Sequence, residues 1–277
     1  MLGGGGFSRG RRFGRNRTVH REKWCWVLAV PREERASGVT PRTPNTTTPQ
    51  HPKPGEQPPY NAARVSKGSA GERIAFVVIC FGYLILASTL AVVSGERSFA
   101  YTNDAVVSMI VLELGIGAAT ILFLRYRGWT AADFGFRVSL KSTLAAIALF
   151  AATYGLCLVA YMLAAPTGMF RGWTDIAVKM TATPGLVVLF LMVNSVFEEL
   201  FVVGYLIEAT PVAEVSFAVS TSALVRLLYH TYQGPVAFVY ILPLGLVFAL
   251  VYIRWRNLWT LMVAHTLFNV VGWLMSA

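Results

Sequence analysis

The last third of the chain carries polar residues inside otherwise apolar stretches. The segment NSVFEEL, residues 194–200, places two adjacent glutamates between the apolar runs GLVVLFLMV and FVVGYLI. A lone polar residue in a membrane helix is usually a hydrogen-bond partner for a neighbouring helix, whereas clusters of ionisable residues there are usually functional. The cluster comprises Asn194, Glu198, Glu199, Arg226, His230, His265 and Asn269. We therefore predict a functional site in this region.

The spacing of these residues groups them in pairs, because residues four apart share one face of a helix. The pairs are Asn194 with Glu198, Arg226 with His230, and His265 with Asn269. Glu198 and Glu199 are separated by about 100° around a helix, so they cannot serve the same point. We expect one of them to face the chemistry and the other to face a partner such as Arg226.

Two imidazoles, a carboxylate and an amide together suit the hydrolysis of an amide bond. A carboxylate in a low-dielectric site can take a proton from water. Neutral imidazoles can orient that water, donate to an oxyanion or bind a divalent metal such as zinc. An asparagine amide can donate to a developing oxyanion. No serine or cysteine is marked by the sequence as a nucleophile.

These side chains must be positioned by membrane-spanning helices. The chain is 55% hydrophobic and 14% charged, which is far more apolar than an average globular protein. A spanning helix needs about 20 mostly apolar residues. Six segments meet or approach this length: 74–94, 105–124, 142–164, 185–207, 236–253 and 258–276. A weaker seventh segment, 213–231, would have to turn its polar groups into the bundle. We predict an all-α, polytopic transmembrane helical bundle of about seven spans.

The Lys/Arg bias of the short loops predicts the orientation of these spans. With seven spans, the N-terminal region, the basic loop at 125–141 and the RWRN turn at 254–257 fall on one side. We expect this side to be the cytoplasm, in a multi-pass protein of the cell membrane whose N-terminus is cytoplasmic. With six spans the RWRN turn would fall outside, which favours the seventh span.

Residues 1–72 differ in composition from the rest of the chain. They hold 13 Lys/Arg and 5 Asp/Glu, in a Gly/Arg-rich stretch followed by a Pro/Thr-rich one. Such a segment cannot bury enough apolar surface to offset the entropy of ordering. We predict a disordered basic tail at 1–72 and a transmembrane domain at 73–277, with its motif core at 185–277. The bilayer is the expected partner of the tail, and no nucleic acid is expected.

The motifs resemble those of the CAAX protease and bacteriocin-processing family, also called the Abi family, of intramembrane proteases. That family has three motifs in order: Glu-Glu-x-x-x-Arg, Phe-x-x-x-His, and His-x-x-x-Asn or Asp. Here EELFVVG (198–204) matches the first at both glutamates and at the following glycine. RLLYH (226–230) matches the second at its histidine, and HTLFN (265–269) matches the third fully. The resemblance covers roughly residues 105–277.

The resemblance implies an intramembrane endopeptidase that cleaves a membrane-associated protein or peptide. By this resemblance Glu198 activates water, His230 and His265 position the water or coordinate a metal, and Asn269 helps stabilise the oxyanion. Glu199 is a supporting residue, and we add Arg226 and Asn194 to the supporting set from their spacing. The family's motifs leave open whether the enzyme is a metalloprotease or a metal-free glutamate protease. They also do not imply that the substrate is prenylated.

The chain departs from the family pattern at two positions. The arginine of the first motif is Val203, and the phenylalanine of the second is Arg226. The first change removes a cation that should pair with a glutamate, and the second returns one from a neighbouring helix. We therefore hypothesise a swapped ion pair between Arg226 and Glu199. The alternative is a non-catalytic membrane protein on the same scaffold, for bacteriocin self-immunity or substrate capture.

A third interpretation is a small transporter or proton relay built on Glu113, Glu198 and Glu199. The sequence has no inverted repeat or paired broken helices of the kind that transporters use. We interpret Glu113 as structural, because a buried carboxyl can be neutral or paired between helices. Counted along the expected spans, Glu198 and His265 fall near mid-membrane, whereas His230 falls near an outer end. Either the polar helix is tilted or set deeper in the membrane, or the segment boundaries are off by several residues, and we expect the latter.

Overall fold

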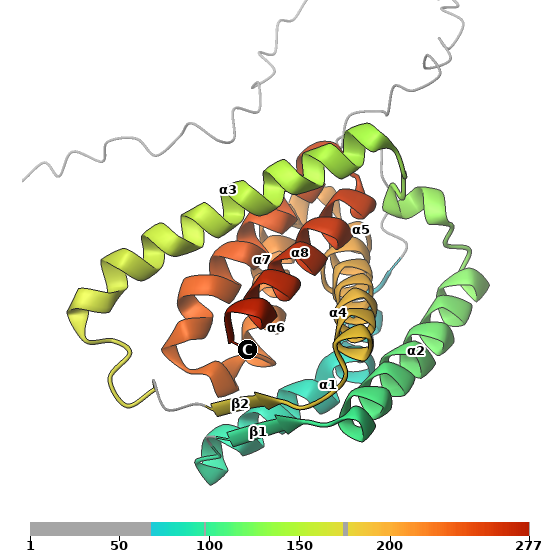
Figure 1. The fold of residues 1–277 in the computed structure, drawn as a ribbon. Helices are drawn as coiled ribbons and strands as arrows, with labels where there is room; N and C mark the ends of the chain where they lie inside the picture. The colour runs from blue at the N-terminus through green and yellow to red at the C-terminus, as the bar shows by residue number, and fades with distance from the viewer. Residues whose placement is uncertain (1–67, 97, 174–176, 277) are drawn as a thin grey trace, which may run out of the picture. The chain divides into compact units, whose positions relative to one another are not determined.

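The computed structural model describes residues 68–96, 98–173 and 177–276. The predicted disordered tail lies outside these residues, apart from its last few. The described part is a helical bundle with one small sheet (Figure 1). Its longer helices are α1 (Ala70–Ser94), α2 (Asn103–Tyr126), α3 (Leu140–Ala164), α4 (Pro184–Glu198), α6 (Val215–Leu228), α7 (Pro235–Trp255) and α8 (Leu258–Ser276).

Short helical elements connect or extend these helices. A π-helix, η3 (Glu199–Tyr205), and the one-turn α5 (Leu206–Glu208) continue the line of α4. The remaining short elements are 3₁₀ turns: η1 (Ala131–Phe134), η2 (Ala165–Thr167), η4 (Val212–Glu214) and η5 (Thr231–Gln233). The expectation of an all-α bundle is therefore confirmed for most of the described chain.

Within the described residues, six helices are long and apolar enough to cross a membrane, and they correspond to the six clear segments of the sequence. The weaker seventh segment forms α6, which has 14 residues. It starts after α5 and leads into η5. There the hydroxyls of Thr231 and Ser88, in the last third of α1, lie 2.8 Å apart. The arrangement agrees with about seven spans.

The outer surface of the bundle is apolar. Val93 on α1, Leu122 on α2 and Leu163 on α3 each expose at least 70% of their surface. In water such a surface would promote aggregation, whereas lipid tails can pack against it. Together with the six apolar helices, it shows a multi-pass membrane protein.

One end of the bundle, which we call the basic end, gathers the loops that the sequence analysis places on one side. Arg127, just after α2, pairs with Glu72 in the first turn of α1 at 2.9 Å. Arg256, just after α7, pairs with Glu208 of α5 at 2.8 Å and donates to the carbonyl of Asp133 in η1. The N-terminus of α1, the loop after α2 and the turn after α7 therefore lie at the same end. That this end faces the cytoplasm stays a prediction.

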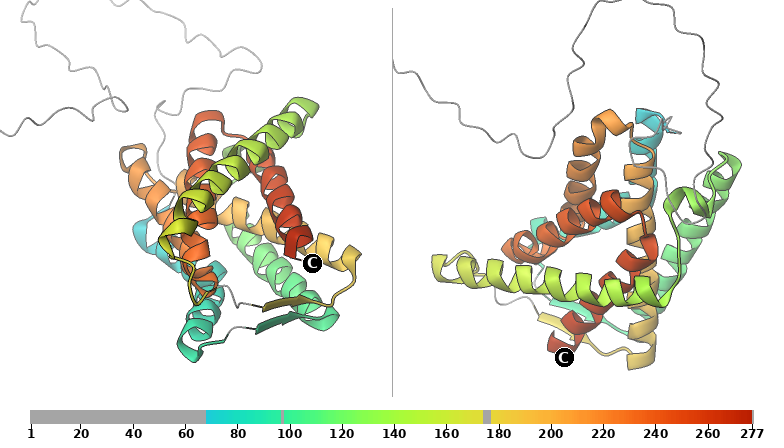
Figure 2. Two further views of the ribbon diagram at one scale, coloured as in Figure 1. Left: turned by 60° about the vertical axis from the view of Figure 1, so that its left-hand side comes forward. Right: turned by 90° about the horizontal axis from the view of Figure 1, so that it is seen from above.

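A two-stranded parallel sheet lies at the opposite end, which we call the sheet end (Figure 2). Strand β1 (Ser98–Tyr101) pairs in register with β2 (Ala177–Met180). The carbonyl of Tyr101 then accepts from the amides of Thr181 and Ala182 at 3.0 Å each, which leads the chain into α4. Neither four-residue strand was predicted, because each is stabilised by a partner nearly eighty residues away.

Candidate active site

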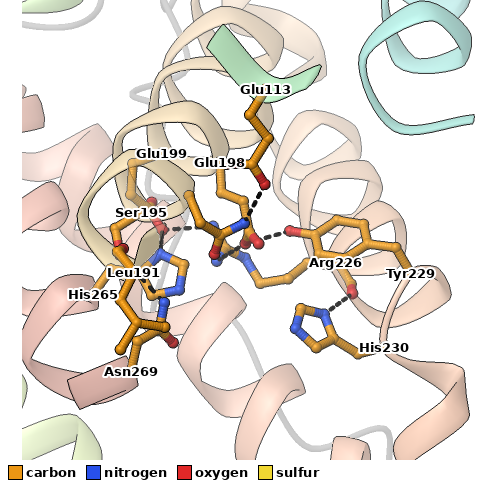
Figure 3. A network of polar contacts seen from close by, with 11 residues as sticks. Glu113, Leu191, Ser195, Glu198, Glu199, Arg226, Tyr229, His230, His265 and Asn269 are labelled. Atoms are coloured by element: carbon orange, nitrogen blue, oxygen red, sulfur yellow. Dashed lines mark hydrogen bonds and ion pairs between the residues drawn. The ribbon is translucent and has the colours of Figure 1, made fainter. Parts of the chain in front are cut away.

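The predicted site residues meet where α4, α6 and α8 pack together inside the bundle (Figure 3). Glu198 and Glu199 stand at the junction of α4 with the π-helix. Arg226 lies in the last turn of α6, and His265 lies on α8. All four residues are at most 4% exposed. The charges of the two glutamates and of Arg226 are therefore placed where water screens them little.

Arg226 bridges the two glutamates. Its Nη1 lies 3.1 Å from Oε2 of Glu198, and its Nη2 lies 2.8 Å from Oε1 of Glu199. The hypothesised ion pair with Glu199 is therefore present. The expectation that only one glutamate would face Arg226 was wrong, because the planar guanidinium presents two amino groups that can reach different carboxylates.

A glycine on the neighbouring helix faces the stem of this arginine. A Cβ atom on Gly245 of α7 would lie 3.4 Å from Cδ of Arg226 and 3.5 Å from Cα of Ala223. These are ordinary van der Waals distances, so a methyl group at 245 would touch both neighbours without a clash. A larger side chain at 245 would have to share the space of the arginine stem.

The two carboxylates are held differently. Glu198 uses Oε2 for both its bonds: it accepts from Arg226 and from the hydroxyl of Tyr229 at 2.5 Å. Glu199 uses Oε1 for both its bonds, from Arg226 and from His265. Oε2 of Glu199 is enclosed and has no hydrogen-bond partner in the part of the chain that the structure describes. Oε1 of Glu198 makes no hydrogen bond with the described residues, and Glu198 keeps 3% of its surface exposed against 0% for Glu199.

Tyr229 was missed by the sequence analysis. It ends α6 directly before His230, and its ring stacks on Phe81 of α1 with the centroids 5.5 Å apart. Its buried hydroxyl finds its acceptor on Glu198. The available signal was its place inside the motif RLLYH, but a tyrosine next to a helix end has many structural roles.

Both histidines are oriented through Nδ1. Nδ1 of His265 lies 2.7 Å from Oε1 of Glu199, and Nδ1 of His230 lies 2.9 Å from the carbonyl of Arg226. Each partner is an acceptor, so in the neutral imidazole the proton is assigned to Nδ1. Nε2 of each ring is then an acceptor, without a hydrogen-bond partner among the described residues. Figure 3 shows the rings arriving from α8 and from the end of α6.

The mismatch in depth disappears in the structure. α6 spans Val215–Leu228 instead of 213–231, and its Arg226 lies level with Glu198 and Glu199. His230 follows the end of the helix, and its ring turns back to the carbonyl of Arg226. The boundaries of α6 differ from the expected ones by two or three residues, and the helix ends at the level of the glutamates.

Asn269 is tied to α4 through a serine that was not predicted. Its Nδ2 donates to the hydroxyl of Ser195 at 3.2 Å, and that hydroxyl donates to the carbonyl of Leu191 at 2.7 Å. Ser195 is 0% exposed and lies one turn before Glu199. His265 and Asn269 therefore lie on one face of α8, as the spacing predicted, and that face contacts Glu199 of η3 and Ser195 of α4. Ser195 was missed because serine commonly bonds its own helix backbone.

Asn194 points to a different neighbour from Glu198. Its Nδ2 donates to Oε1 of Glu113 on α2 at 2.9 Å. Glu113 is 3% exposed, and its Oε2 has no partner among the described residues. Pairing between helices was one of the two structural interpretations offered for Glu113. Asn194 thus links α4 to α2 beside the network of Glu198, and no hydrogen bond joins it to Glu198.

Val203, which replaces the arginine of the first motif, lies in the π-helix. Val203 is 0% exposed and belongs to the main apolar core. Gly204 follows it, where a Cβ atom would lie 3.4 Å from Phe134 of η1 and 3.5 Å from Leu258 of α8. Single-turn π-bulges inside α-helices occur often at functional sites. Here the wider turn begins at Glu199, which holds both Arg226 and His265.

The donor atoms of the site include kinds that zinc prefers, namely imidazole nitrogen and carboxylate oxygen. His230 and His265 were the predicted ligands. Within the described ranges, however, no three His, Cys, Asp or Glu side chains gather closely enough to hold a metal. The arrangement is that of a hydrogen-bonded carboxylate and imidazole site.

The fold and the site together define a polytopic membrane protein with an enclosed polar centre. Residues 179–271 match the family model described as Type II CAAX prenyl endopeptidase Rce1-like. The match runs from β2 to α8, includes every predicted site residue, and confirms the resemblance to the CAAX protease and bacteriocin-processing family. No curated protein and no solved structure is similar enough to the chain to match it.

Proposed function

We propose that the chain is an intramembrane endopeptidase that hydrolyses a peptide bond of a membrane-associated protein or peptide. One observation carries this proposal. Glu198 has one oxygen fixed by Arg226 and Tyr229 and the other free of partners among the described residues, in the same network as a histidine whose Nδ1 is fixed by Glu199. A positioned base beside positioned imidazoles is what water activation requires.

Glu198 is the proposed base. The two donors on Oε2 fix the plane of the carboxylate and leave Oε1 to take a proton from water. The hydroxide so formed attacks the carbonyl carbon of the scissile peptide bond. The proton on Glu198 then passes to the amine nitrogen as the C–N bond breaks, which restores the carboxylate.

His265 and His230 are proposed to position the water. With Nδ1–H donated to Glu199 and to the Arg226 carbonyl, each Nε2 can accept a hydrogen bond from water or substrate. Glu199 serves His265 as an orienting carboxylate, which fixes the tautomer and the ring plane. Glu198 is thus assigned to the reaction itself, and Glu199 is assigned to holding His265 in place.

Asn269 is proposed to stabilise the oxyanion. One N–H of its amide donates to Ser195, which leaves the other N–H for the tetrahedral intermediate. Donors that are already oriented cost no reorganisation when charge develops, which is the main advantage of such sites. Ser195 is thus a positioning residue, held in place by the carbonyl of Leu191.

A second function, self-immunity or substrate capture without catalysis, is favoured by Val203. This residue places an apolar side chain where the family has an arginine. Arg226 nevertheless supplies a cation to both glutamates, so the charge that the motif needs is not lost. For this reason we propose the protease first.

The experiment compares membranes that contain the wild-type chain with membranes that contain Glu198→Gln. New protein termini near membrane-spanning segments are identified by mass spectrometry. Termini found only with the wild type support the protease. Identical termini, with both chains equally inserted and equally resistant to thermal unfolding, support the non-catalytic alternative.

A further inference from the structure

A separate cavity lies between α3 and α7 at the basic end of the bundle. Its volume is about 810 Å³, within the range of about 300–1,000 Å³ that is common for ligand pockets. No residue of the candidate active site lines it. We call it the α3–α7 cavity.

One end of the α3–α7 cavity is cationic and polar. Arg137, Ser139 and Lys141 line it from the start of α3, and Asn257 lines it from the turn before α8. Arg137 and Lys141 are exposed, and neither pairs with a carboxylate of the described residues.

Two acidic groups of the basic end have partners outside the cavity. Asp133 accepts from the backbone and the hydroxyl of Thr130, at 2.7 and 2.8 Å. Glu208 pairs with Arg256. The cationic end of the cavity therefore lacks a counterion from the described chain, and it complements an anionic group.

The rest of the α3–α7 cavity is apolar. On α3 it is lined by the small side chains of Ala145, Ala148 and Ala152. On α7 it is lined by Val247 and Val251. From Lys141 to Ala152 the helix advances by about 17 Å. This is roughly half of the 30 Å hydrocarbon core of a bilayer. The apolar wall of the cavity is therefore about as long as the hydrocarbon layer of one leaflet.

We propose that the α3–α7 cavity binds one anionic phospholipid. The phosphate contacts Arg137 and Lys141, and one acyl chain lies along the alanine face of α3. Basic pockets between spanning helices suit anionic headgroups. A zwitterionic lipid carries its own cation next to the phosphate, so it gains less from these two side chains. This binding site is independent of the proposed peptidase activity.

The experiment uses the full chain in vesicles of equal parts phosphatidylglycerol and phosphatidylcholine. The protein is extracted in mild detergent, and the lipids that stay bound are counted by mass spectrometry. The wild type is expected to retain phosphatidylglycerol over phosphatidylcholine. Arg137→Gln with Lys141→Gln should reduce this preference by about fivefold for each cation lost.

Two further variants make the result specific to the cavity. Ala148→Trp fills the apolar wall without changing charge, and it should also abolish the preference. Arg125→Gln with Arg254→Gln removes two exposed cations of the same end that do not line the cavity, and it should keep the preference. Thermal unfolding in detergent verifies that each variant is folded.

Three outcomes would overturn the proposal. Equal retention of both lipids by the wild type would show that the cavity does not select a headgroup. If Arg125→Gln with Arg254→Gln reduced the preference for phosphatidylglycerol as much as Arg137→Gln with Lys141→Gln, the lipid would be attracted by surface charge alone. A folded Ala148→Trp variant that still prefers phosphatidylglycerol would place the lipid elsewhere.

Discussion

Nη2 of Arg226 lies 2.8 Å from Oε1 of Glu199. The cation that the family motif supplies on the same helix as the glutamates comes here from α6. Removing one partner of a buried ion pair leaves an uncompensated charge. The stability and the activity of the site are therefore expected to depend on Arg226, a residue outside the altered first motif.

Arg226→Ala is expected to inactivate the protein and to lower the free energy of unfolding by roughly 3–5 kcal/mol. Adding Val203→Arg should restore part of the activity and part of the stability, because the π-helix places position 203 one turn after Glu199. Val203→Arg alone should destabilise, since Arg226 already occupies both glutamates. Thermal unfolding and terminus formation measure these effects. No recovery in the double variant would remove the support for an exchanged cation.

Tyr229→Phe is expected to slow cleavage by about tenfold, equivalent to about 1.4 kcal/mol. The ring can keep its stacking on Phe81, but Oε2 of Glu198 loses the donor that fixes it. The matched control is Tyr252→Phe, which removes a hydroxyl bonded to the Phe134 carbonyl at the basic end. The control should lower stability by about 1 kcal/mol and leave the cleavage rate unchanged. Equal rates for the two variants would argue against a role for the Tyr229 hydroxyl.

Gly245→Leu is expected to displace Arg226, because its side chain would enter the space that the arginine stem and Ala223 occupy. Overpacking of this kind costs about 1–3 kcal/mol, and activity should fall with it. Gly115→Leu is the control, since a Cβ atom at 115 meets nothing within 4 Å. Thermal unfolding and cleavage assays compare the two, and equal tolerance of both changes would contradict the packing described for α6 and α7.

The helices could be predicted well from the sequence, but the contacts between them could be predicted less well. The long apolar runs leave little choice but spanning helices, and the i, i+4 spacing placed His265 and Asn269 correctly on one face. Polar residues in α6 weakened its apolar signal, so its boundaries were off by two or three residues. The altered motif suggested the ion pair between Arg226 and Glu199, but other contacts between distant segments were not predicted, as between Tyr229 and Glu198 or between β1 and β2. These depend on packing that leaves no local pattern.

Asn269→Ala is expected to reduce kcat by about 10²–10³ with little change in KM, since an oxyanion donor acts mainly in the transition state. Ser195→Ala should reduce kcat less, because it frees the Asn269 amide without removing it. Both constants are measured on a substrate identified from its new termini. An effect of Ser195→Ala as large as that of Asn269→Ala would assign the serine a more direct role.

The most direct measurement compares Glu198→Gln with Glu199→Gln in the same membranes. Glutamine keeps the shape of each side chain, and only Glu198 is assigned to the reaction. The account predicts that Glu198→Gln loses the wild-type termini, with a rate lower by at least about 10². Glu199→Gln should retain part of the activity, because its amide oxygen can still accept from His265. Wild-type termini in membranes containing Glu198→Gln would contradict the assignment of Glu198 as the base.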